Sequence, residues 1–177
     1  MKLFIAILFL AGNLSAANPL PPEQINTLIG ALGRLDSDLV NSNPALKKRL
    51  GQVLDAVRGE ARSVALIKKF QVKGRESDLL AVAVKHPNDP AGVEAMGMVL
   101  AGDGKKAVIA LLIGKDAQQA AAVAKALGNS NNPGVIPMLA PLVLNITLHA
   151  NVRKEAVKGL ANYEAGAKHL LSLAEDG

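Results

Sequence analysis

The feature that most constrains this chain is a long series of apolar stretches with helical spacing, separated by short breaks. The breaks carry Gly, Pro, Asn or Asp, and Pro begins several stretches, where its missing N–H is tolerated. No stretch has the sustained alternation of apolar and polar residues that indicates a β-strand. We therefore expect an all-α fold. Helices are predicted over residues 22–35, 44–57, 60–70, 77–85, 90–101, 105–113, 117–127, 133–144, 152–163 and 165–174.

Three leucines close segments of similar shape in the second half of the chain. Leu100, Leu127 and Leu160 stand in the phrases VLAG, ALGN and GLAN, at intervals of 27 and 33 residues. Each phrase is followed by a turn and then by a second apolar stretch. Because one helix pair cannot cover its own apolar face, this recurrence predicts stacked antiparallel helix pairs with the three leucines in their core.

The most specific phrase is NVRKEAVKGL at residues 151–160. It places Asn151 at the expected N-cap, Val-Arg next, and then small or apolar residues at helical spacing. The phrase resembles the first helix of a HEAT repeat, and PGVIPML at residues 133–139 resembles the second. The resemblance implies a HEAT-like α-solenoid of stacked antiparallel helix pairs over residues 44–177.

Arg153 has a distinct place in this interpretation. The small and apolar residues of the phrase face the neighbouring helices, while Arg153 is placed to brace carbonyls or a carboxylate of the adjoining repeat. The preceding repeat departs from the pattern, since Gln119-Ala120 stands where Val-Arg is expected.

Over residues 20–177 the chain is also similar to the helical-repeat region of large secreted bacterial proteins that continue into a c-type cytochrome domain. The similarity rests on apolar patterns such as VALIKKFQVKGRESDLLAVAV and GAKHLLSLAEDG. That family carries its haem on a CxxCH motif, and this sequence has no cysteine, so no haem ligand is implied here. The resemblance implies an alternative function, the N-terminal docking region of a c-type cytochrome or dehydrogenase electron-transfer system. The haem-binding domain would then lie downstream or on another chain.

The N-terminus has the features of a secretory signal peptide. Lys2 precedes an apolar run over residues 3–11, and Ser15 and Ala17 occupy the small-residue positions that a signal peptidase reads. The run is shorter than the roughly 20 residues that span a bilayer. We therefore expect cleavage near Ala17 and a mature protein in the periplasm or outside the cell, without a transmembrane segment. The expected organisation is a signal peptide at 1–17, an N-terminal helix and linker at 18–43, and HEAT-like repeats at 44–177.

Residues suited to catalysis or metal binding are scarce. The absence of cysteine excludes disulfides, thiolate metal sites and cysteine nucleophiles. The histidines His86, His149 and His169 lack the spacing of a metal site. One arrangement stays open, in which His149 and His169 approach each other and Glu155 or Glu164 joins them. No GxSxG elbow occurs and no glycine loop follows a strand, so we expect no catalytic, cofactor or metal site and a protein that is not an enzyme.

Positive charge is concentrated between residues 47 and 75. Nine basic residues stand there against Asp55 and Glu60, and this excess is larger than the net charge of +5 of the whole chain. Such an excess attracts acidic partners over about 10 Å at ordinary salt, although charge runs are also typical of solvated helix faces. The predicted partner-binding basic patch consists of Lys47, Lys48, Arg49, Arg58, Arg62, Lys68, Lys69, Lys73 and Arg75.

These observations favour binding over catalysis. The predicted function is a non-catalytic helical-repeat binding or scaffold module that mediates protein–protein interaction. Its expected partner is another protein, and the second resemblance singles out a c-type cytochrome or dehydrogenase. Nucleic acid is not expected, because the chain is exported and its basic residues are not interleaved with aromatic ones.

Overall fold

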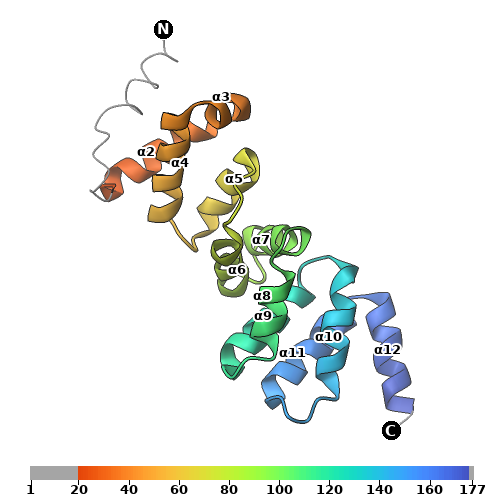
Figure 1. Cartoon of the computed structure of the whole chain (residues 1–177). Coiled ribbons are helices and arrows are strands. Elements are labelled where there is room, and N and C mark those ends of the chain that lie inside the picture. The colour runs from red at the N-terminus through yellow and green to blue at the C-terminus, as the bar shows by residue number, and fades with distance from the viewer. Residues whose placement is uncertain (1–19, 176–177) are drawn as a thin grey trace. The chain divides into compact units, whose positions relative to one another are not determined.

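The expected all-α fold is confirmed by the computed structural model, which describes residues 20–175. Within these residues it contains eleven α-helices, one short 3₁₀ helix and no strand (Figure 1). The predicted signal peptide at residues 1–17 lies outside the described residues. The chain divides into two compact units, Met1–Lys73 and Gly74–Gly177, and each is considered by itself.

The first unit contains the helices predicted at 22–35, 44–57 and 60–70, and a further short one. The additional helix, α3, lies in the segment that we expected to be a linker. Its six residues are too few to show a helical period in the sequence, and Asp36 starts it by accepting the backbone N–H of Asp38 at 2.8 Å. The bounds are α2 (Pro22–Gly33), α3 (Ser37–Ser42), α4 (Pro44–Ala56) and α5 (Ala61–Phe70).

The C-terminal end of α5 is tied to α3 in this unit. Phe70 is 2% exposed. The last carbonyls of a helix have no partner inside the helix, and here they accept hydrogen bonds from α3. Ser37 Oγ donates to the Lys69 carbonyl at 2.9 Å, and Asn41 Nδ2 donates to the Phe70 carbonyl at 3.4 Å. Other buried apolar side chains come from all four helices: Leu28, Leu32, Val40, Leu50, Val53 and Ile67.

The second unit contains the seven helices predicted from residue 77 onward. The stretch predicted at 133–144 begins as the 3₁₀ helix η1 (Pro133–Val135) and continues as α10, because Pro133 and Pro137 suit first turns. The α-helical bounds are α6 (Glu76–Lys85), α7 (Pro90–Ala101), α8 (Lys105–Leu112), α9 (Ala117–Gly128), α10 (Ile136–Val143), α11 (Ala150–Ala161) and α12 (Glu164–Glu175).

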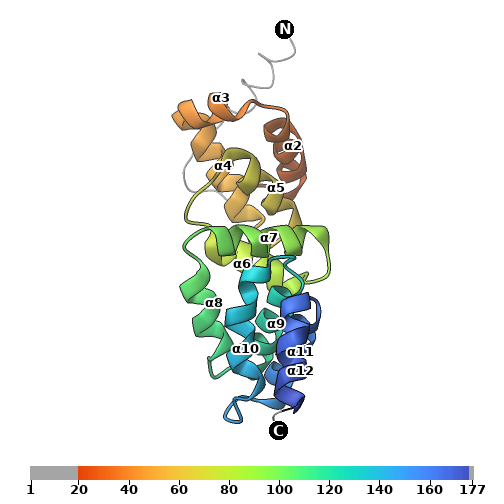
Figure 2. The ribbon, with the colours of Figure 1, turned by 90° about the vertical axis from the view of Figure 1, so that its right-hand side faces the viewer.

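Helices α9 and α11 lie side by side and approach closely at two glycines (Figures 1 and 2). A Cβ atom on Gly128 would overlap the Cα of Gly159, and a Cβ atom on Gly159 would lie 3.0 Å from the Cα of Gly128. Backbones approach this closely only where neither residue has a side chain. The contact therefore requires glycine on both helices.

The three leucines predicted for the core are buried. Leu100 is 4% exposed, and Leu127 and Leu160 are fully buried. Their positions at the ends of α7, α9 and α11 agree with the recurrence of the leucine phrases.

The intervals between those phrases are not equivalent, however. Asn162, just after α11, donates through Nδ2 to the Gly128 carbonyl at the end of α9, at 3.0 Å. Asn129, just after α9, donates instead to the Pro87 carbonyl at 3.0 Å, beyond the end of α6. The end of α9 thus lies against the end of α6, not that of α7. The 27-residue interval from Leu100 to Leu127 does not repeat the geometry of the 33-residue interval.

Candidate interaction surfaces

Acidic residues and histidines do not converge anywhere in the described part of the chain. Within residues 20–175 no group of three or more His, Asp or Glu side chains is placed to hold a metal ion. The ring of His86 lies 3.1 Å from the Asp89 carboxylate at the end of α6. This pair occupies a turn, where it joins the two ends of a short connection.

His149 has a structural role at the start of α11. Its Nδ1 accepts the backbone N–H of Asn151 at 3.3 Å, and the helix begins at Ala150. The expectation that Asn151 is the N-cap is therefore wrong. The cap lies two residues earlier because an imidazole nitrogen can accept the same N–H that an Asn or Asp oxygen usually accepts.

The predicted basic patch is divided between the two units. Eight of its residues belong to the first unit, and Arg75 belongs to the second. On α4, the side chains of Lys47 and Lys48 are exposed, whereas Arg49 is 7% exposed and bonds to Gln52 at 3.2 Å. Only part of the predicted patch therefore reaches solvent on this helix.

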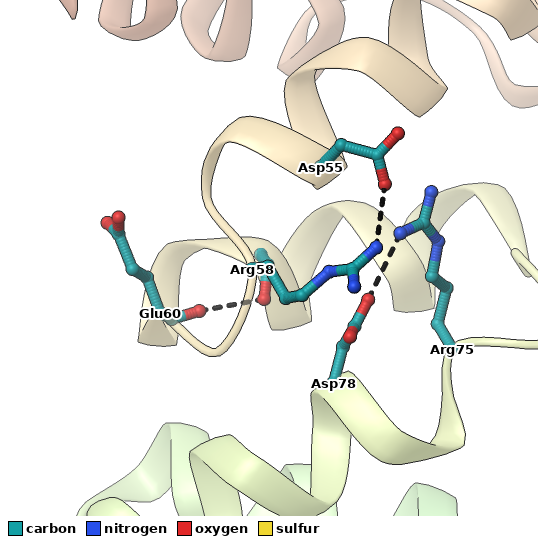
Figure 3. Close-up of polar contacts among 6 residues, drawn as sticks. Asp55, Arg58, Glu60, Arg75 and Asp78 are labelled. Atoms are coloured by element: carbon teal, nitrogen blue, oxygen red, sulfur yellow. Dashed lines mark hydrogen bonds and ion pairs between the residues drawn. The ribbon is translucent and has the colours of Figure 1, made fainter.

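Several other members of the patch make contacts within their own unit. Arg58 pairs with Asp55 at 3.2 Å, and Arg75 pairs with Asp78 at 3.1 Å (Figure 3). Arg62 pairs with Glu60 at 2.7 Å and also donates to the side chain of Asn26. The pairs with Asp55 and Glu60 are already included in the excess counted from the sequence, and the pair with Asp78 lowers the net charge by one more.

The lysines at and after the end of α5 have different surroundings. Lys69 donates from Nζ to the Gly33 carbonyl at 2.6 Å and lies over the ring of Phe70, 5.6 Å from its centroid. Lys68 and Lys73 are exposed. The exposed lysines of the patch are Lys47, Lys48, Lys68, Lys69 and Lys73.

An apolar groove in the second unit was not predicted. It has a volume of about 700 Å³ and lies along α6 and α8. Glu76 and Lys85 bring charge to its rim, while its walls are apolar. The sequence did contain a signal for such a groove. The run AVIALLI at residues 107–113 is apolar on all sides, whereas a short helix with one buried face needs apolar residues on that face only. The wall residues are Leu80, Ala81, Val84, Val99, Ala107, Ala110 and Leu111.

Large apolar side chains also stand out into solvent in the second unit. Ile113 is 62% exposed, Leu171 64% and Ile146 84%. Among the described residues, every large hydrophobic side chain that is this accessible belongs to residues 74–177. Apolar residues scattered singly are ordinary on a protein surface, whereas neighbouring ones mark contact sites, and Ile109 and Ile113 stand four residues apart on and just after α8. The full set is Ile109, Ile113, Leu144, Ile146, Val157 and Leu171.

Arg153 on α11 differs from the other arginines of the chain. Its Nε is buried and has no hydrogen-bond partner among the described residues. The sequence predicted that this side chain would brace carbonyls or a carboxylate of an adjoining repeat. In the structure, the Nε donor is in place and its acceptor is not supplied by residues 20–175.

The surface of the described residues thus contains an apolar groove, exposed apolar side chains and exposed lysines. Within residues 20–175, no helix is both long and apolar enough to cross a bilayer. The groove beside α8 and the exposed isoleucines are apolar, whereas the exposed lysines of α4 are cationic. No known family, curated protein or solved structure matches this chain.

Proposed function

We propose that this chain is a non-catalytic helical-repeat binding or scaffold module that acts in the periplasm or outside the cell and mediates protein–protein interaction. The observation that carries the proposal is the display of large hydrophobic side chains on the second unit, including Ile109 and Ile113 on and just after α8. Burying one such side chain is worth roughly 1.5–3 kcal/mol. A partner that covers several of them gains a favourable contact.

The finer fold that we propose for the second unit is a HEAT-like stack, with α9–α10 and α11–α12 as successive helix pairs. In support, α9 and α11 have 12 residues each and begin 33 residues apart, at Ala117 and Ala150. Each is followed by an asparagine, Asn129 or Asn162, that donates to a carbonyl at the end of an earlier helix. A repeated length, cap position and stacking bond are what a helix-pair solenoid requires.

The surface proposed for the partner is the side of α8 that carries the exposed side chains of Ile109 and Ile113, which is not the side that lines the groove. Ile109 lies inside α8 and Ile113 directly follows it, so the two are four residues apart and share one helix face. An amphipathic segment of the partner would place its apolar side chains against Ile109 and Ile113.

Affinity capture with matched variants tests this proposal. The mature chain, residues 18–177, is used as bait for periplasmic and membrane extracts of its source. The double variant Ile109→Glu, Ile113→Glu should lose the captured protein, because it places two charges in the apolar contact. Ile146→Glu, with its side chain 84% exposed at a connection, is the control and should keep it. A capture that is the same with all three chains would contradict the proposed surface.

The second candidate function is docking of a c-type cytochrome or dehydrogenase, and the exposed lysines of α4 favour it. Lys47 and Lys48 stand side by side near the start of the helix and reach solvent. Docking through them would be steered by charge, so capture would weaken strongly between about 50 and about 300 mM salt, as the Debye length falls from roughly 14 Å to roughly 6 Å. Capture that resists salt and depends on the α8 isoleucines favours the scaffold function instead.

Export is part of the proposal and has its own test. N-terminal sequencing of the protein from a periplasmic fraction or culture medium should give Asn18 as the first residue, since cleavage is expected after Ala17. Recovery of a chain that still begins with Met1 in the cytoplasm would contradict it.

A further inference from the structure

The repeat that relates α9 to α11 identifies an uncovered helix face. Gly128 meets Gly159 of α11, so the face of α9 that carries Gly128 is the one covered by α11. Ala120 and Ala124 are spaced by four residues from each other and from Gly128, and therefore share this face. Ala120 is 1% exposed and Ala124 is fully buried. The contact of α9 with its neighbour thus uses a stripe of small residues.

A shift of 33 residues carries this stripe onto α11. The equivalent residues are Arg153, Val157 and Ala161, again spaced by four. Val157 is 38% exposed and Ala161 is exposed, whereas their counterparts on α9 are buried. The face that a neighbouring helix covers on α9 is therefore open on α11.

Helix α12 gives the same indication for the second helix of this pair. Of its 12 residues only Gly166 is buried, although it carries Leu170, Leu171 and Leu173. Leu171 is 64% exposed. A helix with three leucines on or near its surface has apolar area for which the described chain supplies no cover.

We infer that the face of α11 formed by Arg153, Val157 and Ala161 binds an α-helix of a partner protein that carries an acidic residue and a small-residue stripe. The inference rests on the proposed function and names the partner's chemistry at a second surface. The equivalence of α9 and α11 indicates the shape of the occupant. The equivalent face of α9 is covered by a helix that has a glycine at the crossing.

The charged residues of this face indicate the chemistry of the occupant. Arg153 stands where α9 has Ala120, and no hydrogen bond joins its side chain to residues 20–175. Its Nε is covered by the chain itself, so an outside acceptor would bond to the terminal nitrogens of the guanidinium. Lys154 is exposed beside it, and Glu155 is already paired with Lys158 at 2.7 Å. A carboxylate is the acceptor that satisfies a guanidinium most strongly. The occupant should therefore place Asp or Glu opposite Arg153.

A second copy of the chain is a poorer occupant than an acidic helix. A two-fold contact through this face would bring Arg153 and Lys154 of one copy near those of the other. Like charges in an interface disfavour association. A head-to-tail stack would need the Gly159 face of α11 in a second copy. That face is blocked, because α9 of the same copy already covers it at Gly128.

The test uses two stapled helical peptides with the sequence of residues 150–161. These residues form α11, which covers the equivalent face of α9. One peptide has Glu and the other has Lys in place of Val152. This position is seven residues before Gly159 and so shares the face of Gly159 on the peptide. In the bound peptide it would lie near the level of Arg153 of the chain. Binding of the labelled peptides to the mature chain is measured by fluorescence anisotropy. We expect the Glu peptide to bind at least about tenfold more tightly, as one charge-assisted hydrogen bond implies.

Variants of the chain connect this binding to the face. Val157→Glu should weaken the Glu peptide at least about tenfold, and Arg153→Gln should remove the preference for Glu over Lys. Ile146→Glu is the control for surface charge, and circular dichroism melts check that each variant folds. Equal binding of both peptides, or binding that Val157→Glu leaves unchanged, would overturn the inference.

Two outcomes separate this inference from the proposed function. If affinity capture succeeds through the α8 isoleucines but the peptides do not bind, only the inference about α11 fails. If sedimentation shows a dimer that Val157→Glu dissociates, a second copy occupies the face and the acidic-helix partner is wrong.

Discussion

Gly128 and Gly159 meet with almost no space between their backbones, and this contact sets the distance between α9 and α11. A Cβ atom on Gly128 would overlap the Cα of Gly159. Both helices are rich in alanine near this point, which lets the backbones stay close along their length. The alanine-rich composition of the second unit is thus explained by helix packing and not by helix propensity alone.

Gly128→Ala should destabilise the second unit by about 1–3 kcal/mol, because the added methyl group meets backbone that cannot rotate away. Urea unfolding of the mature chain, followed by circular dichroism, measures the change. Gly97→Ala is the matched control: it lies inside α7 with no atom within 4 Å of its added Cβ. That variant should be more stable by up to about 1 kcal/mol, since alanine is the better helix former. Equal effects of the two substitutions would contradict the close crossing.

Leu127→Ala and Leu160→Ala should each lower the free energy of unfolding by about 2–5 kcal/mol, because both leucines are fully buried and leave cavities. Leu144→Ala is the control, since Leu144 is 67% exposed and its truncation should cost under about 0.5 kcal/mol. Thermal melts of the three variants give the comparison. A small effect at Leu127 or Leu160 would show that the leucine phrases do not mark the core.

Much of the helical fold was predictable because its signals are local. Prolines at the first turns of α4, α7 and η1 and the polar breaks between stretches give helix bounds within a residue or two of those observed. The short helix α3 was missed because six residues do not establish a period. Its cap, Asp36, was the one available signal.

The stacking register was harder to predict, because it depends on contacts between distant residues. The leucine phrases suggest that Leu100 and Leu127 are equivalent, but Asn129 bonds to Pro87 at the end of α6. No sequence pattern distinguishes an asparagine that caps its own helix from one that bonds to an earlier one. Over the 33-residue interval, the structure shows the same helix length, cap position and terminal asparagine in α9 and α11.

The surfaces were predictable only in part. Counting charges identified the basic segment, but the count could not show that Arg58 pairs with Asp55 or that Lys69 bonds to the Gly33 carbonyl. The apolar groove beside α8 depends on the angle between helices. Composition carries no information about that angle, so the groove appeared only with the structure.

The capping role of His149 gives a prediction that separates structure from sequence pattern. His149→Ala should cost about 0.5–2 kcal/mol, the usual range for removing an N-cap, because the N–H of Asn151 loses its acceptor. Asn151→Ala should change stability by less than about 0.5 kcal/mol, since its side chain is exposed and only its backbone N–H takes part. Urea unfolding of both variants measures the difference. If Asn151→Ala were the more damaging, the cap would lie where the HEAT pattern places it.

The asparagine that follows α9 provides the last test, since it joins the ends of two helices distant in sequence. Asn129 Nδ2 donates to the Pro87 carbonyl at 3.0 Å and to Asn88 Oδ1 at 2.8 Å. Asn129→Ala leaves the Pro87 carbonyl without this donor and should cost about 1–3 kcal/mol. Asn129→Asp is the informative companion, because it keeps the shape but replaces a donor with acceptor oxygens. If the amide donor is what matters, the aspartate variant should be at least as unstable as the alanine variant at neutral pH. Hydrogen exchange of the backbone amides at the end of α6 should rise in both. An aspartate variant as stable as the wild type would show that the side chain only fills space, and that α6 and α9 are held together by their apolar faces alone.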